Sequence, residues 1–262
     1  ETYGGPQVRA LTIASRPFLE DPPEGFHPTL MTPRPLLQVA RPGRGQVIDG
    51  LFEQVRSLVT AAAVVDAVEA ARLCPILRPE AVAKGLYEPH AMELDVHALH
   101  QGYVAGLRAR GGAIRRRCQA VRLEQTDNGW VVHATEGVVT RARIVVNAAG
   151  AWADRLAHVA GCRPVGLTPR RRTIFTVPAD APRADPRLPL LYDADETFYV
   201  KPEGEQFLCS PADRTPCEPG DATADPIAIA RALDEIREVT TLSARSVRTS
   251  WAGLRTFAPD EE

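Results

Sequence analysis

The chain has 262 residues, 44% hydrophobic and 24% charged, which is the balance of a soluble globular protein of one large domain or two modest ones. Its formal net charge of −2 argues against the basic surface of a nucleic-acid-binding protein and against a broad membrane patch. No apolar run approaches the roughly 18 residues that a transmembrane helix needs.

The first third of the chain alternates between helix and strand patterns. Residues 6–19 have apolar side chains at helical spacing and lead into a Pro/Gly turn. Residues 34–40 predict a strand, and residues 46–62 predict a helix. The clearest helix covers residues 93–112, with Asp95 as its N-cap and two glycines at its end.

The period then changes from helical spacing to alternation. Residues 113–150 predict successive short strands, with Asp127-Asn128-Gly129 as a hairpin turn. Residues 143–147 are nearly all apolar after Arg143, which is typical of a central parallel strand covered on both faces. A helix over residues 151–161 follows and ends at Gly161.

The last hundred residues are short, alternating and interrupted by proline. Residues 163–209 predict an antiparallel sheet, residues 225–242 a helix and residues 246–257 a further strand. The fold class is therefore mixed α/β (α+β), with an antiparallel layer in the second half.

The bend at Asn147–Gly150 consists of small residues between a strand and a helix start. Unpaired N–H groups gather at such a start, and small side chains let a ligand approach the backbone. The bend therefore suits a phosphate or another anionic group. Close packing of strand on helix, without a ligand, is the alternative.

The cysteine pattern points to an intracellular protein without a metal centre. Five cysteines have neither CxxC spacing nor a nearby histidine at metal-ligand spacing, so we expect reduced thiols, a cytoplasmic location and no metal site: Cys74, Cys118, Cys162, Cys209 and Cys217. His97 and His100 lie on the clearest predicted helix, and we interpret both as packing residues rather than bases.

Many segments, in one order, resemble a known family. The segments "ETYGGPQVRALT", "ALHQGY", "VVNAAGAW", "GLTPRRRTIF", "FYVKP" and "SWAGLRTF" are similar to FAD-dependent D-amino-acid oxidases, glycine oxidases and D-amino-acid dehydrogenases, especially the D-arginine-dehydrogenase type. The resemblance implies an incomplete Rossmann-like FAD-binding domain and an antiparallel-sheet substrate domain. It assigns residues 1–33 and 93–162 to the first, residues 34–92 and 163–250 to the second, and residues 251–262 to a return into the first.

The resemblance also implies which residues approach the FAD. Ala148, Ala149, Gly150 and Trp152 match the family's bend beside the dinucleotide, and the backbone near Ala120 and Val121 matches its adenine contact. The family's initial GxGxxG unit and final glycine-rich stretch are both missing from the sequence. We therefore expect a partial copy of a longer chain, and the 262 residues alone need not hold the cofactor.

The resemblance places Arg172, Arg255 and Tyr199 at the substrate, with Tyr3 above it on a mobile lid. Arginine suits a substrate carboxylate because its planar fork matches the two oxygens. The residues themselves leave alternatives open: a solvated arginine run for Arg172, an internal salt bridge for Arg255 and a core position for Tyr199.

Leu36 matches the position of an acidic residue that faces the cationic substrate tail in arginine-type members. A leucine cannot pair with a guanidinium, and an unpaired buried cation is costly. We therefore expect a preference for apolar or aromatic D-amino acids over D-arginine.

The leading hypothesis is an FAD-dependent enzyme that oxidises D-amino acids to imino acids and hence keto acids, with an unidentified electron acceptor. The first alternative is an oxygen-using oxidase of glycine, sarcosine or another amine. The second is a non-catalytic fragment, or a substrate-binding module whose partner chain supplies the dinucleotide half.

Overall fold

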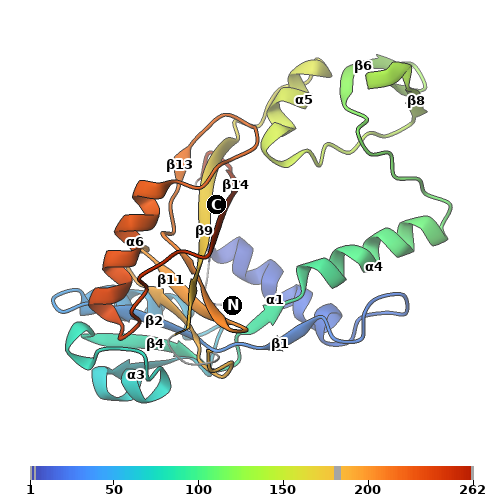
Figure 1. The fold of residues 1–262 in the computed structure, drawn as a ribbon. Coiled ribbons are helices and arrows are strands. Elements are labelled where there is room, and N and C mark those ends of the chain that lie inside the picture. Colours follow the sequence, from blue (N-terminus) through green and yellow to red (C-terminus); the bar gives the residue numbers. More distant parts are fainter. Residues whose placement is uncertain (1, 3, 180–183, 261–262) are drawn as a thin grey trace. The chain divides into compact units, whose positions relative to one another are not determined.

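The computed structural model describes residues 2, 4–179 and 184–260, and it confirms the mixed α/β class. The chain divides into two compact units, and several segments of sequence contribute to each. Unit 1 contains residues 1–102, 172–214 and 222–253. Unit 2 contains residues 103–171, 215–221 and 254–262. Figure 1 shows the elements of both along the chain.

Unit 1 carries most of the regular structure. Its helices are α1 (Pro6–Glu20), α2 (Gly45–Val55), α3 (Ala67–Leu73) and α6 (Pro226–Val239), with a 3₁₀ turn at Pro79–Ala81. Its strands are β1 (Met31–Pro33), β2 (Leu36–Ala40), β3 (Ala63–Asp66), β4 (Lys84–Glu88), β5 (Met92–Leu94), β10 (Leu190–Asp193), β11 (Tyr199–Glu203) and β12 (Gln206–Ser210). Three elements cross the division between the units: α4 (Val96–Ala109), β9 (Thr168–Pro178) and β14 (Thr249–Phe257).

A large mixed sheet organises these strands. Within the described residues it has nine strands, in the order β13-β9-β12-β11-β10-β2-β4-β3, with β14 also paired to β9. The pairs β9–β12, β12–β11 and β11–β10 are antiparallel, whereas β10 and β2 are parallel. The antiparallel layer predicted over residues 163–209 is confirmed.

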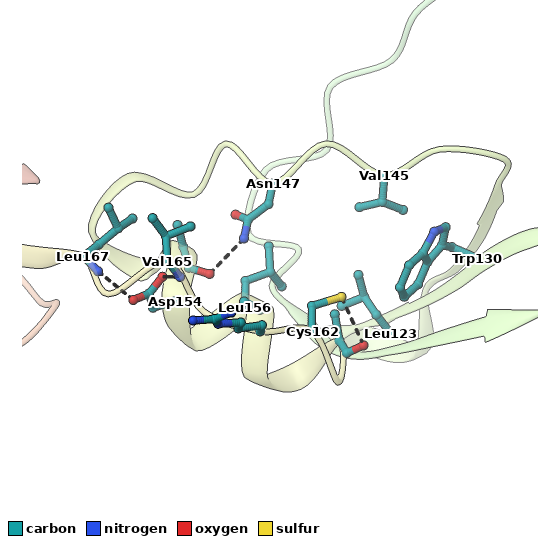
Figure 2. A pocket seen from close by; sticks show the side chains of 13 residues that line it. Leu123, Trp130, Val145, Asn147, Asp154, Leu156, Cys162, Val165 and Leu167 are labelled. Carbon is teal, nitrogen blue, oxygen red and sulfur yellow. Dashed lines mark hydrogen bonds between the residues drawn. The ribbon is translucent and has the colours of Figure 1, made fainter. Parts of the chain in front are cut away.

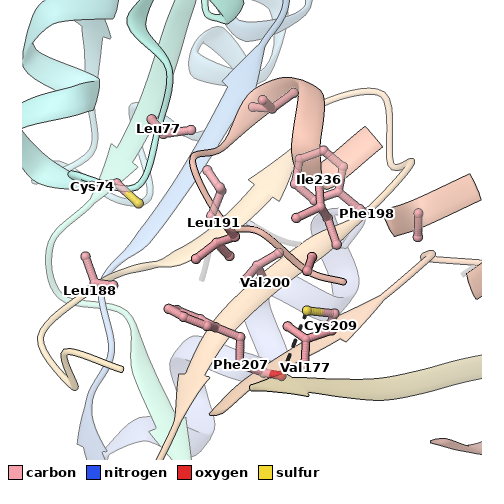
Figure 3. Packing of buried hydrophobic residues seen from close by; sticks show 14 of the residues in the cluster. Cys74, Leu77, Val177, Leu188, Leu191, Phe198, Val200, Phe207, Cys209 and Ile236 are labelled. Carbon is pink, nitrogen blue, oxygen red and sulfur yellow. Dashed lines mark hydrogen bonds between the residues drawn. The ribbon is translucent and has the colours of Figure 1, made fainter. Parts of the chain in front are cut away.

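One face of this sheet forms the main hydrophobic core. Leu191, Val200 and Cys209 project from neighbouring strands and pack with Ile236 of α6, and all four are buried (Figure 3). Burial of such side chains contributes about 25 cal/mol for each Å² of apolar surface removed from water. Because side chains alternate along a strand, the residues between these core positions lie on the opposite face.

The helix starts follow the capping residues in the sequence. The Oδ1 atom of Asp95 accepts a hydrogen bond from the backbone N–H of Ala98 (2.8 Å), which confirms Asp95 as the N-cap of α4. Asp225 caps α6 in the same way, accepting from the N–H groups of Ile227 and Ala228. Such a cap satisfies an otherwise unpaired N–H and stabilises a helix by about 1 kcal/mol.

Unit 2 contains a three-stranded antiparallel sheet and a short helix. The strands are β6 (Ala120–Thr126), β7 (Gly129–Ala134) and β8 (Val139–Ala142), with a 3₁₀ turn at Thr135–Gly137. A 3₁₀ turn at Gly150–Trp152 leads into α5 (Ala153–Val159), and β13 is Thr215–Pro216. Asp127 and Asn128 connect β6 to β7, so the predicted hairpin turn is confirmed.

Two predicted strands and one predicted helix are corrected. Residues 113–119 and 143–149 belong to no strand, and Ile144 and Val146 are 78% and 81% exposed instead of covered on both faces. Apolar content suggested a central strand, but a strand also needs neighbours for its ladder, and the described residues pair none with this segment. Helix α2 ends at Val55 instead of residue 62, and β3 begins at Ala63.

Candidate functional site

Arg172, Tyr199 and Leu36 share one face of the unit 1 sheet. The strand register pairs Tyr199 with Tyr192 and with Ser210, and pairs Leu190 with Leu36. These residues alternate with the core positions, so they project from the face opposite α6. Tyr199 occupies the middle strand, two strand spacings (about 10 Å) from both β9 and β2. The sheet therefore presents Tyr199 between the other two predicted substrate residues.

Arg172 is a buried cation with unused hydrogen-bonding capacity. It is 9% exposed, and its Nε and Nη2 atoms have no hydrogen-bond partner among the described residues. The next residue, Thr173, is held by the Asp213 carboxylate through its N–H (2.6 Å) and its hydroxyl (2.9 Å). A guanidinium removed from water normally has an anionic partner, so the orientation of Arg172 suits a ligand carboxylate.

Tyr199 and Leu36 each have a defined neighbour in the sheet. The ring of Tyr199 stacks on that of Tyr192, with centroids 6.1 Å apart. Leu36 is half-buried and lies directly opposite Glu88 in the β2–β4 pair. Glu88 is 1% exposed, and its Oε2 atom accepts hydrogen bonds from the N–H (3.3 Å) and hydroxyl (2.7 Å) of Thr2. The carboxylate nearest Leu36 along this register is therefore already engaged.

The remaining predicted substrate residues are not brought together with these. Arg255 belongs to unit 2, whereas Arg172 belongs to unit 1, so a shared carboxylate clamp stays a prediction. The Arg255 guanidinium carbon lies 5.3 Å from the ring centroid of Phe257, and the side chain is half-buried. Trp251, on the same strand as Arg255, is 47% exposed. Tyr3 lies outside the described residues.

Asn147 holds the small-residue bend in unit 2, and Asp154 holds the segment that follows the next helix. Asn147 donates from Nδ2 to the carbonyl of Ala153 (2.8 Å) and accepts from the N–H of Ala149 (3.3 Å). The Asp154 carboxylate accepts from the N–H groups of Val165, Gly166 and Leu167 at 2.7–3.0 Å. Figure 2 shows Asn147 and Asp154 among the residues that line an apolar cavity of about 330 Å³ beneath the bend.

Those hydrogen bonds also set the charge of Asp154. Desolvation by burial raises its pKa, but the three backbone N–H donors outweigh this effect and hold the pKa below its ordinary value of 3.8. The carboxylate is therefore ionised at neutral pH and ties the start of α5 to the segment that follows the helix.

A second cavity in unit 2 collects three of the predicted cofactor residues. Ala120, Ala149 and Trp152 line this cavity, which has a volume of about 470 Å³, within the range of small-molecule sites. Gly150 adopts φ +53°, and a side chain there would meet nothing within 4 Å, so open space adjoins the bend. Val121 and Ala148 are exposed beside it. Small lining side chains, an exposed indole and accessible backbone suit one end of a flat nucleotide.

Sequence reasoning missed four further residues of this cavity, which we call the Trp152 cavity. They are Gln119, Arg155, Leu156 and Val159. Arg155, Leu156 and Val159 follow Trp152 at helical spacing, so the predicted helix over residues 151–161 carried the signal. Gln119 immediately precedes the predicted adenine contact.

His97 and His100 line neither unit 2 cavity, whereas Cys162 is among the residues that line the cavity beneath the bend. His97 and His100 are exposed on α4, so the prediction that they are packing residues is wrong. The five cysteines are free, and burial raises the pKa of the Cys74 thiol to about 12, which leaves it inert. No cluster of metal-ligating side chains occurs within the part of the chain that the structure describes. None of its helices is long and apolar enough to cross a membrane.

A single protein-family model matches almost the whole chain. The family model described as "FAD dependent oxidoreductase" matches residues 2–262. Human mitochondrial dimethylglycine dehydrogenase is 28% identical over 139 residues, which is 52% of this chain and 16% of that protein. The mouse protein of the same name matches equally, with 28% identity over 141 residues. The chain thus spans about a sixth of the length of these relatives.

Solved structures of low sequence identity share the fold. Glycine oxidase from Geobacillus kaustophilus superposes with a TM-score of 0.78 at 19% identity, covering 98% of this chain and 67% of that one. The open form of NikD, an amino acid oxidase of nikkomycin biosynthesis, gives 0.81 at 18% identity over 99% and 70%. L-α-glycerophosphate oxidase from Mycoplasma pneumoniae, solved with FAD bound, gives 0.80 at 17% identity over 98% and 71%.

Proposed function

The chain belongs to the FAD-dependent oxidoreductase family, and we propose that it forms the substrate-binding part and one end of the cofactor site of an enzyme that oxidises D-amino acids to imino acids. The observation that carries the substrate assignment is the buried Arg172 guanidinium, with two nitrogen atoms unpartnered among the described residues. A substrate carboxylate would supply the missing acceptor oxygens and offset the charge.

The other predicted residues have roles that follow from their chemistry. Tyr199 would donate its hydroxyl to the substrate without adding a charge, and Arg255 would complete the carboxylate clamp. Tyr3 would exclude water from above. In this proposal the protein contributes mainly by orienting the substrate, and FAD, when bound, supplies the two-electron acceptor.

The cofactor would enter unit 2 through the Trp152 cavity. Ala120, Ala149 and Trp152 line it, and Val121, Ala148 and Gly150 are their neighbours in sequence. Its volume of about 470 Å³ fits the adenine end better than a whole dinucleotide. We therefore infer that other parts of the full protein hold the rest of FAD.

Substrate choice would depend on Leu36. Its side chain offers apolar contact, and the neighbouring Glu88 carboxylate is engaged by Thr2. A cationic side chain would lose its water without gaining a free carboxylate at this position. We propose apolar or aromatic D-amino acids as substrates, in preference to D-arginine.

A second candidate is an oxygen-using oxidase of glycine, sarcosine or a related amine. The identity to dimethylglycine dehydrogenase and the shared fold with glycine oxidase favour a small N-substituted substrate. These substrates have the same carboxylate, so Arg172 would serve both candidates.

Expression of the full protein that contains this chain tests both proposals. A yellow protein with a flavin absorption spectrum is expected. With an artificial electron acceptor, kcat/KM for D-leucine or D-phenylalanine should exceed that for D-arginine. A clear D-arginine preference overturns the assignment of Leu36, and peroxide release with sarcosine favours the second candidate. Absence of bound flavin overturns the proposed function itself.

A further inference from the structure

We propose that the ion pair between Arg155 and Glu218 controls nucleotide binding at the Trp152 cavity, with Arg155 contacting a phosphate of the ligand and Glu218 competing for the same guanidinium. This inference rests on the proposed cofactor site and names two residues that neither the sequence pattern nor the comparisons assign. Both residues lie in unit 2, as does every residue of the cavity.

The lining of the cavity indicates an adenine nucleotide. Trp152 presents a half-exposed indole on which a flat ring can stack, and Ala120 and Ala149 leave room for it. Gln119 supplies an amide that can both donate and accept a hydrogen bond. Arg155 is the lining cation among the described residues, so a charged ligand group would meet it. A nucleotide would match this lining, because its base can stack on Trp152 and bond to Gln119 while its phosphate contacts Arg155.

The existing partner of Arg155 is weakly held. The Nη2 atom of Arg155 lies 2.7 Å from Oε2 of Glu218, and their side chains are 54% and 90% exposed. An ion pair this exposed contributes less than about 1 kcal/mol because solvent and salt screen it and both side chains lose freedom. A phosphate can therefore displace the carboxylate.

Displacement has a consequence for affinity. A phosphate binds an arginine fork through short charge-assisted hydrogen bonds, and Glu218 already accepts from the Nη2 atom of that fork in the absence of ligand. A ligand phosphate that uses Nη2 must break that pair and then lie beside a released carboxylate of like charge. Glu218 thus weakens nucleotide binding, whereas Arg155 strengthens it.

Calorimetric titration of the full, cofactor-free protein with ADP and with adenosine tests the pair. For ADP we expect Arg155→Gln to raise Kd about tenfold and Glu218→Gln to lower it roughly threefold. Neither variant should change the Kd for adenosine by more than about twofold, since adenosine has no phosphate. Both side chains are exposed, so neither change should alter the melting temperature appreciably, and a thermal melt serves as the control.

Five outcomes overturn the inference. An unchanged ADP affinity in Arg155→Gln shows that the guanidinium does not meet the phosphate, and equal losses for ADP and adenosine show a merely structural role. Binding of inorganic phosphate as tight as that of ADP excludes recognition of the base. If wild-type protein binds FAD but not ADP, only this inference fails; if it binds neither, the proposed cofactor site fails with it.

Discussion

Replacement of Arg172 by methionine separates a substrate anchor from a structural arginine. The guanidinium is 9% exposed, and two of its nitrogen atoms have no hydrogen-bond partner among the described residues. Methionine has a similar length and needs no partner, so the substitution removes the charge and keeps much of the packing.

If Arg172 anchors the substrate, Arg172→Met should lower catalytic efficiency without lowering the stability of the protein. A substrate carboxylate held by two charge-assisted hydrogen bonds contributes about 1.5–3 kcal/mol for each bond. Loss of both should reduce kcat/KM by a factor of about 10² to 10⁴, since each 1.36 kcal/mol corresponds to tenfold. The substrate-free protein, by contrast, loses a buried and incompletely satisfied cation, so its melting temperature should stay constant or rise.

Steady-state kinetics and thermal melts of the flavin-loaded protein measure both effects. Arg172→Lys is the matched control, because it keeps the charge but not the fork and should recover only part of the activity. A fall in kcat/KM of less than threefold in Arg172→Met refutes a carboxylate contact. A large fall in melting temperature, together with the activity loss, shows instead that Arg172 supports the fold.

Three further changes test neighbouring steps of the reasoning. Leu36→Glu places a carboxylate opposite buried Glu88, so it should lower the melting temperature. D-arginine should then raise the melting temperature of the variant but not that of the wild type. If the variant does not respond to D-arginine, the role of Leu36 is contradicted. Asp154→Asn should destabilise the protein at pH 7. Because the pKa of Asp154 is depressed in the folded protein, the stabilisation by its carboxylate should be present above pH 3.8 and disappear as the pH falls through the lower pKa of the folded state. Urea unfolding of the wild type and the variant between pH 2 and 7 measures this dependence. Asp95→Ala removes the N-cap of α4 and should lower the free energy of unfolding by about 1 kcal/mol, with Asp95→Asn nearly neutral as the control.

Local signals predicted the elements whose hydrogen bonds are local. The N-cap at Asp95 and the turn at Asp127–Asn128 involve neighbours in sequence, so residue type alone identified them. The sequence left open whether Tyr199 is a core residue, and the structure places Val200, on the other face of the strand, in the core instead.

Elements that depend on partners far away in the sequence could not be predicted from the sequence alone. Residues 143–147 have the composition of a central strand, yet pairing depends on neighbours that composition does not reveal. The helix predicted to residue 62 ends at Val55, and Ala63 begins a strand that pairs with β4. Nor could the sequence distinguish Arg172 from the two arginines before it; only the sheet shows that it is buried with unpartnered nitrogens.

The positions of the two predicted substrate arginines follow from strand length. Strands β9 and β14 have 11 and 9 residues, longer than the others, and both pass from one unit to the other. Arg172 is the first residue of its unit 1 segment, and Arg255 is the second residue of its unit 2 segment. The paired backbone of β9 positions Arg172, and the paired backbone of β14 positions Arg255. Each predicted substrate arginine is thus placed by strand backbone, which fixes a side chain more firmly than a flexible loop does.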